Sequence, residues 1–121
     1  VTGHNFQTGV RAWMTECFGS EIPNDKRERA FRFLEEALEL VQAAGTTKEQ
    51  ALKLVDYVYG RPVGELPQEV GGVGVTLAAF CSAHGIDLLD AQYQELRRCW
   101  NNIEKIRSKQ AAKRDMMGPL P

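Results

Sequence analysis

The sequence has little of what marks a disulfide-stabilised, zinc-binding or membrane-spanning protein. Its three cysteines, Cys17, Cys81 and Cys99, lie far apart with no CxxC pair, which argues against a disulfide framework and against a zinc site. No apolar run is long enough to span a bilayer, and no signal peptide is recognisable at the start. We therefore expect buried free thiols, no membrane partner and a cytoplasmic location.

A large excess of one charge is also missing. The formal net charge is −1 at pH 7 with 26% charged residues, and the positive charge concentrates near the end of one expected helix. This is opposite to the electrostatic footprint of a nucleic-acid binder, so no nucleic-acid partner is expected. The 121 residues, 43% of them apolar, predict one globular domain over residues 1–121. Its ends, residues 1–5 and 114–121, are expected to be flexible.

The chain has no strand pattern of any length, and apolar residues recur instead at helical spacing. The expected helices begin near Phe6, Lys26, Thr47, Gln68 and Leu88. Glycine, proline or a capping residue separates each segment from the next, which is typical of short connections between antiparallel helices. The sequence therefore predicts an all-α fold, a bundle of four to five helices.

Specific residues set the expected helix boundaries. Asn24 or Asp25 is expected to cap the helix that begins at Lys26, and Gly45 to end it, because glycine tolerates positive φ. The segment 46–49 (Thr-Thr-Lys-Glu) has the capping-box pattern of Thr followed three residues later by Glu. Asp87 is expected to cap one last long helix with a basic end.

Three glycines, Gly71, Gly72 and Gly74, lie near the start of the helix expected over residues 68–84. Each costs roughly 1 kcal/mol against Ala inside a helix. Two explanations stay open: close approach of another helix or subunit, or room for a ligand beside the backbone. Because the rest of this helix is apolar nearly all round, we expect it to be central, and we expect the chain to associate with copies of itself.

The helix that begins at Lys26 carries a crowded acidic face. Glu35 and Glu39 are one turn apart, and Glu36 and Glu39 are also neighbours (i, i+3). Mg²⁺ prefers oxygen ligands of this kind, commonly one or two carboxylates together with substrate phosphates. A solvated helix surface is the simpler alternative. Glu69, at the start of the glycine-rich helix, is a carboxylate that a bundle can bring opposite this face.

Two motifs carry a family resemblance: residues 35–39 read Glu-Glu-Ala-Leu-Glu, and residues 69–72 read Glu-Val-Gly-Gly. An all-helical chain with these motifs resembles the MazG-like, all-α nucleoside triphosphate pyrophosphohydrolases of the phage and bacterial type, over roughly residues 6–113. The resemblance implies a symmetric homodimer or homotetramer. It implies Mg²⁺, or Mn²⁺ in its place, as cofactor. It also implies cleavage of the α–β phosphate bond of a nucleoside triphosphate to monophosphate and pyrophosphate.

The same resemblance implies roles for particular residues. The catalytic residues would be Glu35, Glu36, Glu39 and Glu69, of which Glu36, Glu39 and Glu69 would be metal ligands. Basic residues that would contact the triphosphate, and one aromatic residue that would stack on the base, are Lys105, Arg107, Lys109, Lys26, Arg29 and Trp100.

Gly72 departs from the family pattern, because it stands where the second motif has Asp. Three possibilities follow. Asp56 replaces the missing ligand, or the site has three carboxylates and more water, which Mg²⁺ accepts. The third is that the chain has lost turnover and is a helical nucleotide-binding or assembly module.

Overall fold

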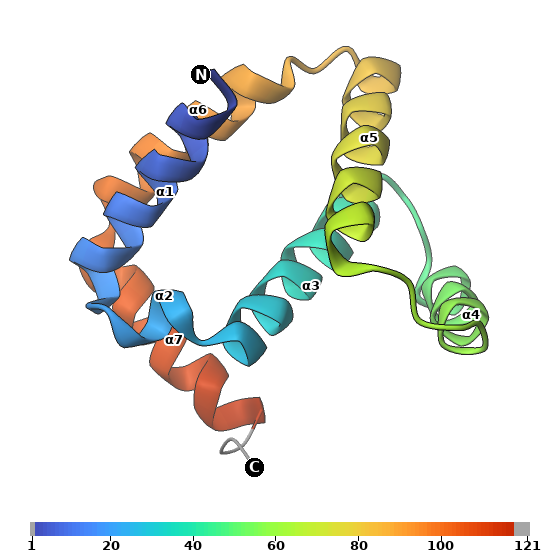
Figure 1. Cartoon of the computed structure of the whole chain (residues 1–121), viewed down its shortest axis with the longest axis horizontal. Coiled ribbons are helices and arrows are strands. Elements are labelled where there is room, and N and C mark those ends of the chain that lie inside the picture. The colour runs from blue at the N-terminus through green and yellow to red at the C-terminus, as the bar shows by residue number, and fades with distance from the viewer. Residues whose placement is uncertain (1, 118–121) are drawn as a thin grey trace. The chain divides into compact units, whose positions relative to one another are not determined.

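The computed structural model describes residues 2–117, with side chains from residue 5 onward, and this part of the chain is helical with no strand. The all-α prediction is therefore confirmed. Seven helices are present (Figure 1): α1 Thr2–Phe18, α2 Glu21–Asn24, α3 Lys26–Ala43, α4 Lys48–Tyr59, α5 Leu66–His84, α6 Leu88–Trp100 and α7 Ile103–Met117.

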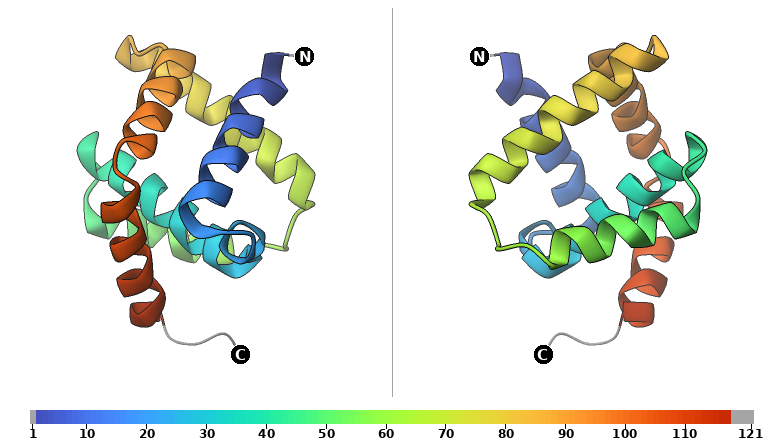
Figure 2. Two further views of the ribbon diagram at one scale, coloured as in Figure 1. Left: turned by 90° about the vertical axis from the view of Figure 1, so that its left-hand side faces the viewer. Right: turned by 90° about the vertical axis from the view of Figure 1, so that its right-hand side faces the viewer.

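The described helices outnumber the expected four or five for two reasons. The short α2 occupies the segment between Phe18 and Lys26 that was expected to be a connection. The last long helix is broken into α6 and α7 (Figure 2), because Asn101 and Asn102 interrupt it. The Asn102 side-chain amide donates a 2.8 Å hydrogen bond to the Arg98 carbonyl oxygen, and asparagine favours such local bonds over continued helix.

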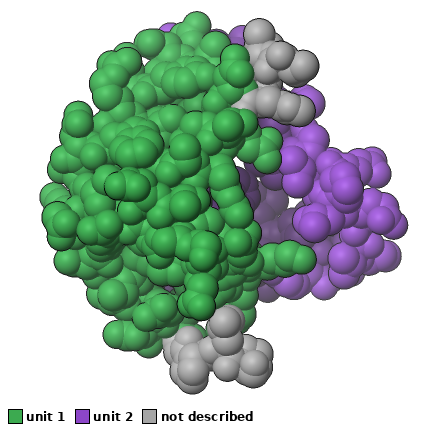
Figure 3. Space-filling model, turned by 60° about the vertical axis from the view of Figure 1, so that its left-hand side comes forward, with its two compact units in different colours: residues 1–31, 87–121 green, residues 32–86 purple. Residues whose placement is uncertain are grey.

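The chain divides into two compact units (Figure 3). Unit 1 comprises Val1–Phe31 and Asp87–Pro121, and unit 2 comprises Arg32–Ile86. The division falls within α3, one turn before the acidic face, although the sequence predicted one domain over residues 1–121. Each unit is described by itself below.

Unit 1 is organised around α1, which packs against α2, α6 and α7. Met14 and Cys17 of α1 are buried, and the Phe6 ring meets the Tyr93 ring of α6 edge-on, with centroids 5.2 Å apart. Gly9 lets α6 approach, because a Cβ there would lie 3.2 Å from Leu96 Cδ2. These contacts form the apolar core of unit 1.

Most expected helix boundaries are confirmed. The Asp25 carboxylate accepts a 3.1 Å hydrogen bond from the Glu28 backbone N–H at the start of α3, and the Asp87 carboxylate accepts one of 2.8 Å from Asp90. Gly45 has φ +98° just past α3. The capping box, however, lies one residue later than expected and joins Thr47 to Gln50.

Parts of the segments expected to be flexible are helical. Helix α1 begins at Thr2 and α7 continues to Met117, so residues 2–5 and 114–117 lie in helices. Residues 1 and 118–121 lie outside the described residues, and the expectation for them is not tested.

The expectation that residues 68–84 form a central helix is wrong for the described chain. In α5 only Cys81 is buried, while Val70 and Val75 are 65% and 71% exposed. A Cβ added at Gly71, Gly72 or Gly74 would meet nothing within 4 Å, so no packed neighbour within unit 2 accounts for these glycines. Helix α4 has no buried residue at all. Helices α4 and α5 carry the expected apolar side chains, but the rest of unit 2 does not bury them.

Within residues 2–117, no single helix is both long and apolar enough to cross a membrane. Helices α5 and α6 taken together pass the same test, by length and composition only.

A buried polar pair ties the start of α3 to α7 inside unit 1. The Gln110 side-chain amide donates a 2.6 Å hydrogen bond to Glu28 Oε2, across 82 residues of sequence. Glu28 is 3% exposed and Gln110 is 6% exposed. Because a buried carboxylate is costly without hydrogen-bond donors, this bond fixes the rotation of α7 relative to the start of α3.

Replacing Gln110 with Ala tests this pair. We expect Gln110→Ala to lower the free energy of unfolding by roughly 1–3 kcal/mol, the cost of removing a donor from a buried polar group. Urea unfolding followed by circular dichroism measures this change. The matched control is Gln94→Ala, which removes an exposed bond to Asp90 and should stay within about 0.5 kcal/mol of the parent. Equal losses in both variants would contradict the role given to Gln110.

Candidate functional site

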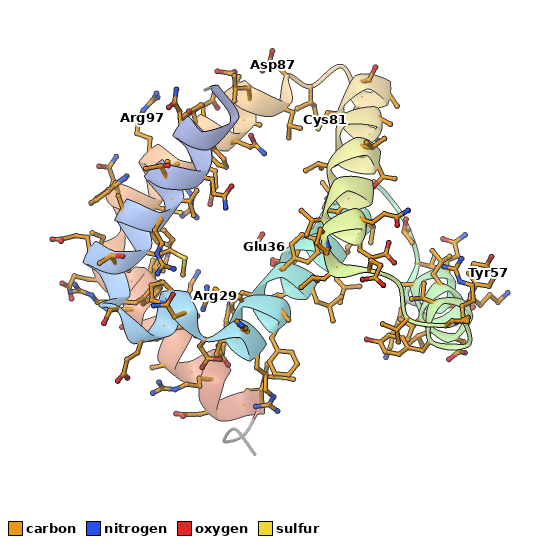
Figure 4. All side chains as sticks on the ribbon, viewed as in Figure 1. Arg29, Glu36, Tyr57, Cys81, Asp87 and Arg97 are labelled. Atoms are coloured by element: carbon orange, nitrogen blue, oxygen red, sulfur yellow. The ribbon has the colours of Figure 1, made fainter. Side chains whose placement is uncertain are left out.

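The acidic face of α3 forms as the sequence predicts, since the helix is capped by Asp25 and continues without a break to Ala43. Glu36, labelled in Figure 4, and Glu39 are exposed. Glu35 is half-buried. Its Oε1 lies 3.0 Å from Nη1 of Arg32, one turn earlier, and the two side chains form an ion pair. Helix α3 therefore presents two exposed carboxylates one turn apart, with a third held beside them by an arginine.

Glu69 lies in the first turn of α5, where the helix dipole favours a negative side chain. Its backbone N–H donates to the Glu65 carbonyl oxygen at 3.0 Å, and its side chain folds back over Gly64 in the preceding loop. This third predicted metal ligand is thus exposed and lies at the start of its helix.

Asp56, the candidate substitute for the missing ligand, lies exposed on α4. Its backbone carbonyl accepts the Gly60 N–H at 3.0 Å and ends that helix. Whether the Asp56 carboxylate replaces the ligand lost at Gly72 stays a prediction.

Among residues described by the structure, no three His, Cys, Asp or Glu side chains gather closely enough to hold a metal ion. The donors nevertheless fit Mg²⁺ in kind, because it prefers carboxylate oxygens and keeps several waters around one or two of them. Glu36 and Glu39, neighbours on an exposed helix face, supply such a pair. A single chain therefore offers an open carboxylate pair rather than a closed metal cage.

Arg107, predicted to contact a triphosphate, has structural partners instead. Its guanidinium donates from Nε to the Cys17 carbonyl oxygen at 2.5 Å and from Nη2 to the Glu16 carbonyl at 3.1 Å. Its Nη1 also pairs with Glu104 at 3.1 Å. The last carbonyls of α1 have no partner inside their own helix, so Arg107 satisfies the C-terminus of α1.

The other predicted substrate-binding residues divide by exposure. Lys26, Lys105 and Lys109 are exposed, and Trp100, at the end of α6, is 42% exposed. Arg29 is half-buried and places Nη1 4.0 Å from Met14 Sδ. All of them, with Arg107, belong to unit 1, whereas Glu35, Glu36, Glu39, Glu69 and Asp56 belong to unit 2.

Sequence reasoning missed the polar contacts that position these elements. Arg11 of α1 donates to the Pro23 carbonyl oxygen and, at 2.6 Å, to Asn24 Oδ1, so it holds α2 against α1. The only local signal was the Pro-Asn pair after a short apolar turn, which is typical of a bend. The α1 carbonyls that accept from Arg107, and the Glu28 carboxylate that accepts from Gln110, are more than eighty residues away, and no local pattern indicates them.

The cysteines are free thiols, and those of α1 and α5 are buried, as expected. Burial raises the pKa of the Cys17 thiol, although the nearby Arg107 guanidinium acts in the opposite direction. Burial likewise raises the pKa of Cys99, with the Glu95 carboxylate adding to the effect. Because the thiolate is the reactive form, neither thiol has the environment of a nucleophile.

No known family model, curated protein or solved structure matches the chain. The resemblance to the MazG-like pyrophosphohydrolases therefore rests on the two motifs alone.

The capping role of Arg107 predicts the effect of its removal. We expect Arg107→Met to lower the free energy of unfolding by about 1–2 kcal/mol, because two carbonyls at the end of α1 lose a charged donor. Lys109→Met, which removes an exposed charge from the same helix, should change it by less than about 0.5 kcal/mol. Chemical denaturation of both variants measures the difference. Unchanged stability together with weaker nucleotide binding in Arg107→Met would return this residue to the phosphate-contact role.

Proposed function

We propose that the chain is a Mg²⁺-dependent nucleoside triphosphate pyrophosphohydrolase, which cleaves the α–β phosphate bond to give a monophosphate and pyrophosphate. The observation that carries this proposal is the acidic face of α3, where Glu36 and Glu39 are exposed one turn apart and Arg32 holds Glu35 beside them. The motif resemblance supplies the reaction, and the donor chemistry of this face supports it.

Each residue has a separate role in this proposal. Glu36 and Glu39 would hold the ion from α3. The resemblance adds Glu69 from the start of α5, although no three such side chains gather within the described residues of one chain. When bound, Mg²⁺ would polarise a water molecule and neutralise charge on the phosphates. Glu35 takes the proton of the attacking water as a general base. The resemblance implies Lys105 and Lys109, which are exposed, as contacts of the triphosphate, whereas Arg107 is occupied by the end of α1.

A second function, a helical nucleotide-binding or assembly module without turnover, is favoured by two specific observations. Gly72 occupies the position of a ligand in the family motif, and no three carboxylates gather within the described chain. Tight nucleotide binding without turnover would favour this module over the enzyme.

We also propose that the protein works as a homodimer or homotetramer, with no nucleic-acid or membrane partner. The support is the uncovered apolar surface of unit 2, where Leu54, Tyr57 and Val75 are 60%, 60% and 71% exposed. A soluble chain rarely leaves so many large apolar side chains of neighbouring helices in water, and a symmetric pair of copies would cover them. The free cysteines fit a cytoplasmic location.

The activity is tested with a panel of nucleoside triphosphates assayed for pyrophosphate release with and without Mg²⁺. We expect release from at least one nucleotide with Mg²⁺ present, and a loss of at least about 100-fold in Glu39→Ala, because a carboxylate ligand is removed. Glu49→Ala is the matched control, since Glu49 is an exposed acid in the first turn of α4 and outside the proposed site. No turnover at high enzyme concentration on the whole panel would remove the enzyme proposal.

Association is tested by size-exclusion chromatography with light scattering. We expect a dimer or tetramer for the parent chain and a smaller species for Val75→Lys, because a charge on the apolar face of α5 is costly to bury. Val63→Lys is the control, since Val63 lies fully exposed in the loop before α5. A monomeric parent at micromolar concentration would contradict the proposal.

A further inference from the structure

Unit 2 lacks a buried core within one chain. Cys81 is the one buried residue between residues 32 and 86, whereas Met14 and Cys17 belong to an apolar core in unit 1. No two of the helices α3, α4 and α5 are among the pairs that pack extensively against each other. The helices of unit 2 therefore lack, within that unit, the packing of an apolar face that normally stabilises a helix.

The uncovered surface of unit 2 has the size of a complete protein–protein interface. Of the 21 large apolar side chains that are exposed in the described chain, sixteen lie in unit 2: four on α3, six on α4, four on α5 and two in the adjoining loops. A standard interface involves about 20–30 residues on each side, and somewhat more than half of its area is apolar. The sixteen side chains therefore match the apolar part of a full interface, which is more than a small ligand covers.

The position of apolar residues around α5 favours a protein core over a membrane surface. Val73 and Val75 are separated by about 200° around the helix axis, and they are 41% and 71% exposed, so both sides of α5 are uncovered. A helix that lies on a bilayer presents one apolar face to lipid and a charged face to water, whereas a helix inside a core is apolar all round.

A second copy of the chain fits this surface. It brings the same three helices with as many uncovered apolar side chains, and a two-fold pairing lets each copy cover the other. Obligate homodimer interfaces are of this kind, because they resemble a domain core cut in half.

Helices α4 and α5 also need such contacts in order to form. Helix α4 has 12 residues, which is close to the length at which an isolated helix is marginal in water. Helix α5 contains Gly71, Gly72 and Gly74, each of which costs roughly 1 kcal/mol against alanine, and no packed neighbour within unit 2 offsets that cost.

We propose that the core of unit 2 is shared between two copies of the chain. Helices α3, α4 and α5 of each copy pack against those of the other, and α4 and α5 lose their helical structure when the copies separate. This inference rests on the association proposed above and is independent of the pyrophosphohydrolase activity. It adds that the folding of unit 2 and association are one transition, whereas unit 1 keeps its core in a single chain.

Hydrogen exchange followed by mass spectrometry tests the shared core in the parent and in Val75→Lys, whose added charge opposes burial of α5. Both are diluted about 100-fold, with light scattering to record their mass. On dissociation we expect the amides of α4 and α5 to lose their protection, while those of α1 and α6 keep theirs. The circular dichroism signal should fall by about a third, because α4 and α5 hold 12 and 19 of the 98 helical residues.

Val63→Lys is the matched control, since Val63 is fully exposed in the loop before α5. We expect this variant to keep the mass and the amide protection of the parent. Loss of protection in α1 and α6 as large as that in α4 and α5 would show general unfolding of Val75→Lys and overturn the separate behaviour of unit 2.

Urea unfolding of the parent gives a second readout that does not require the copies to separate on dilution. A structure built from two copies becomes more stable as protein concentration rises, so the midpoint for loss of helix should increase with concentration. A midpoint independent of concentration overturns the proposal. So does protection of α4 and α5 that appears only when phosphatidylglycerol vesicles are added, which would assign the surface to a membrane.

The outcomes also separate this inference from the association proposed above. A monomeric parent with protected α4 and α5 overturns both. A monomeric Val75→Lys that keeps the protection of α4 and α5 overturns the shared core alone. Because no nucleotide or metal ion enters these measurements, their results do not depend on whether the chain is an enzyme.

Discussion

Unit 1 depends on the hydrogen bond between two buried polar side chains, Glu28 and Gln110. A carboxylate removed from water needs hydrogen-bond donors at the same place, and Gln110 of α7 is one of them. Asp25 fixes the backbone around it by capping Glu28. The start of α3 is thereby held by both local and distant contacts, and the acidic face begins two turns further along the same helix.

Unit 2 is built differently, because its helices are defined mostly by their own sequences. Thr47 and Gln50 form a reciprocal cap on α4, and Gly85 ends α5 with φ +66°. These local bonds define the helices without covering them, and exposed apolar residues lie along α4 and α5. Helices of this length gain most of their stability from packing of an apolar face, so unit 2 by itself gains little of that stability from α4 and α5.

Local patterns predicted the elements well and the contacts between elements poorly. Asp25, Gly45 and Asp87 were recognised as boundary residues, because a cap depends on atoms a few residues away. The break at Asn101 and Asn102 was missed, since the apolar spacing continues across it. Burial of α5 was predicted from its composition, yet composition does not say whether the same chain or another one covers a helix.

In the candidate site, too, local spacing predicted the elements but not the contacts between them. The acidic face of α3 follows from spacing within one helix, and the structure shows Glu36 and Glu39 exposed there. The role of Arg107 did not follow, because its acceptors lie at the end of α1. The contact between Glu69 and Gly64 joins residues five apart, but it depends on how the loop turns into the helix, which the sequence pattern does not specify.

The break between α6 and α7 has a consequence for chain length. Helix α1 has 17 residues and extends about 25 Å, whereas one straight helix over residues 88–117 would extend about 45 Å. The two asparagines let α1 contact both pieces. One residue added within the first turn of α7 would turn the rest of that helix by about 100° about its axis, and Arg107 and Gln110 would leave their partners together. Helical phase therefore disfavours insertions between Ile103 and Arg107, whereas no helix continues through the exposed loop over residues 60–65.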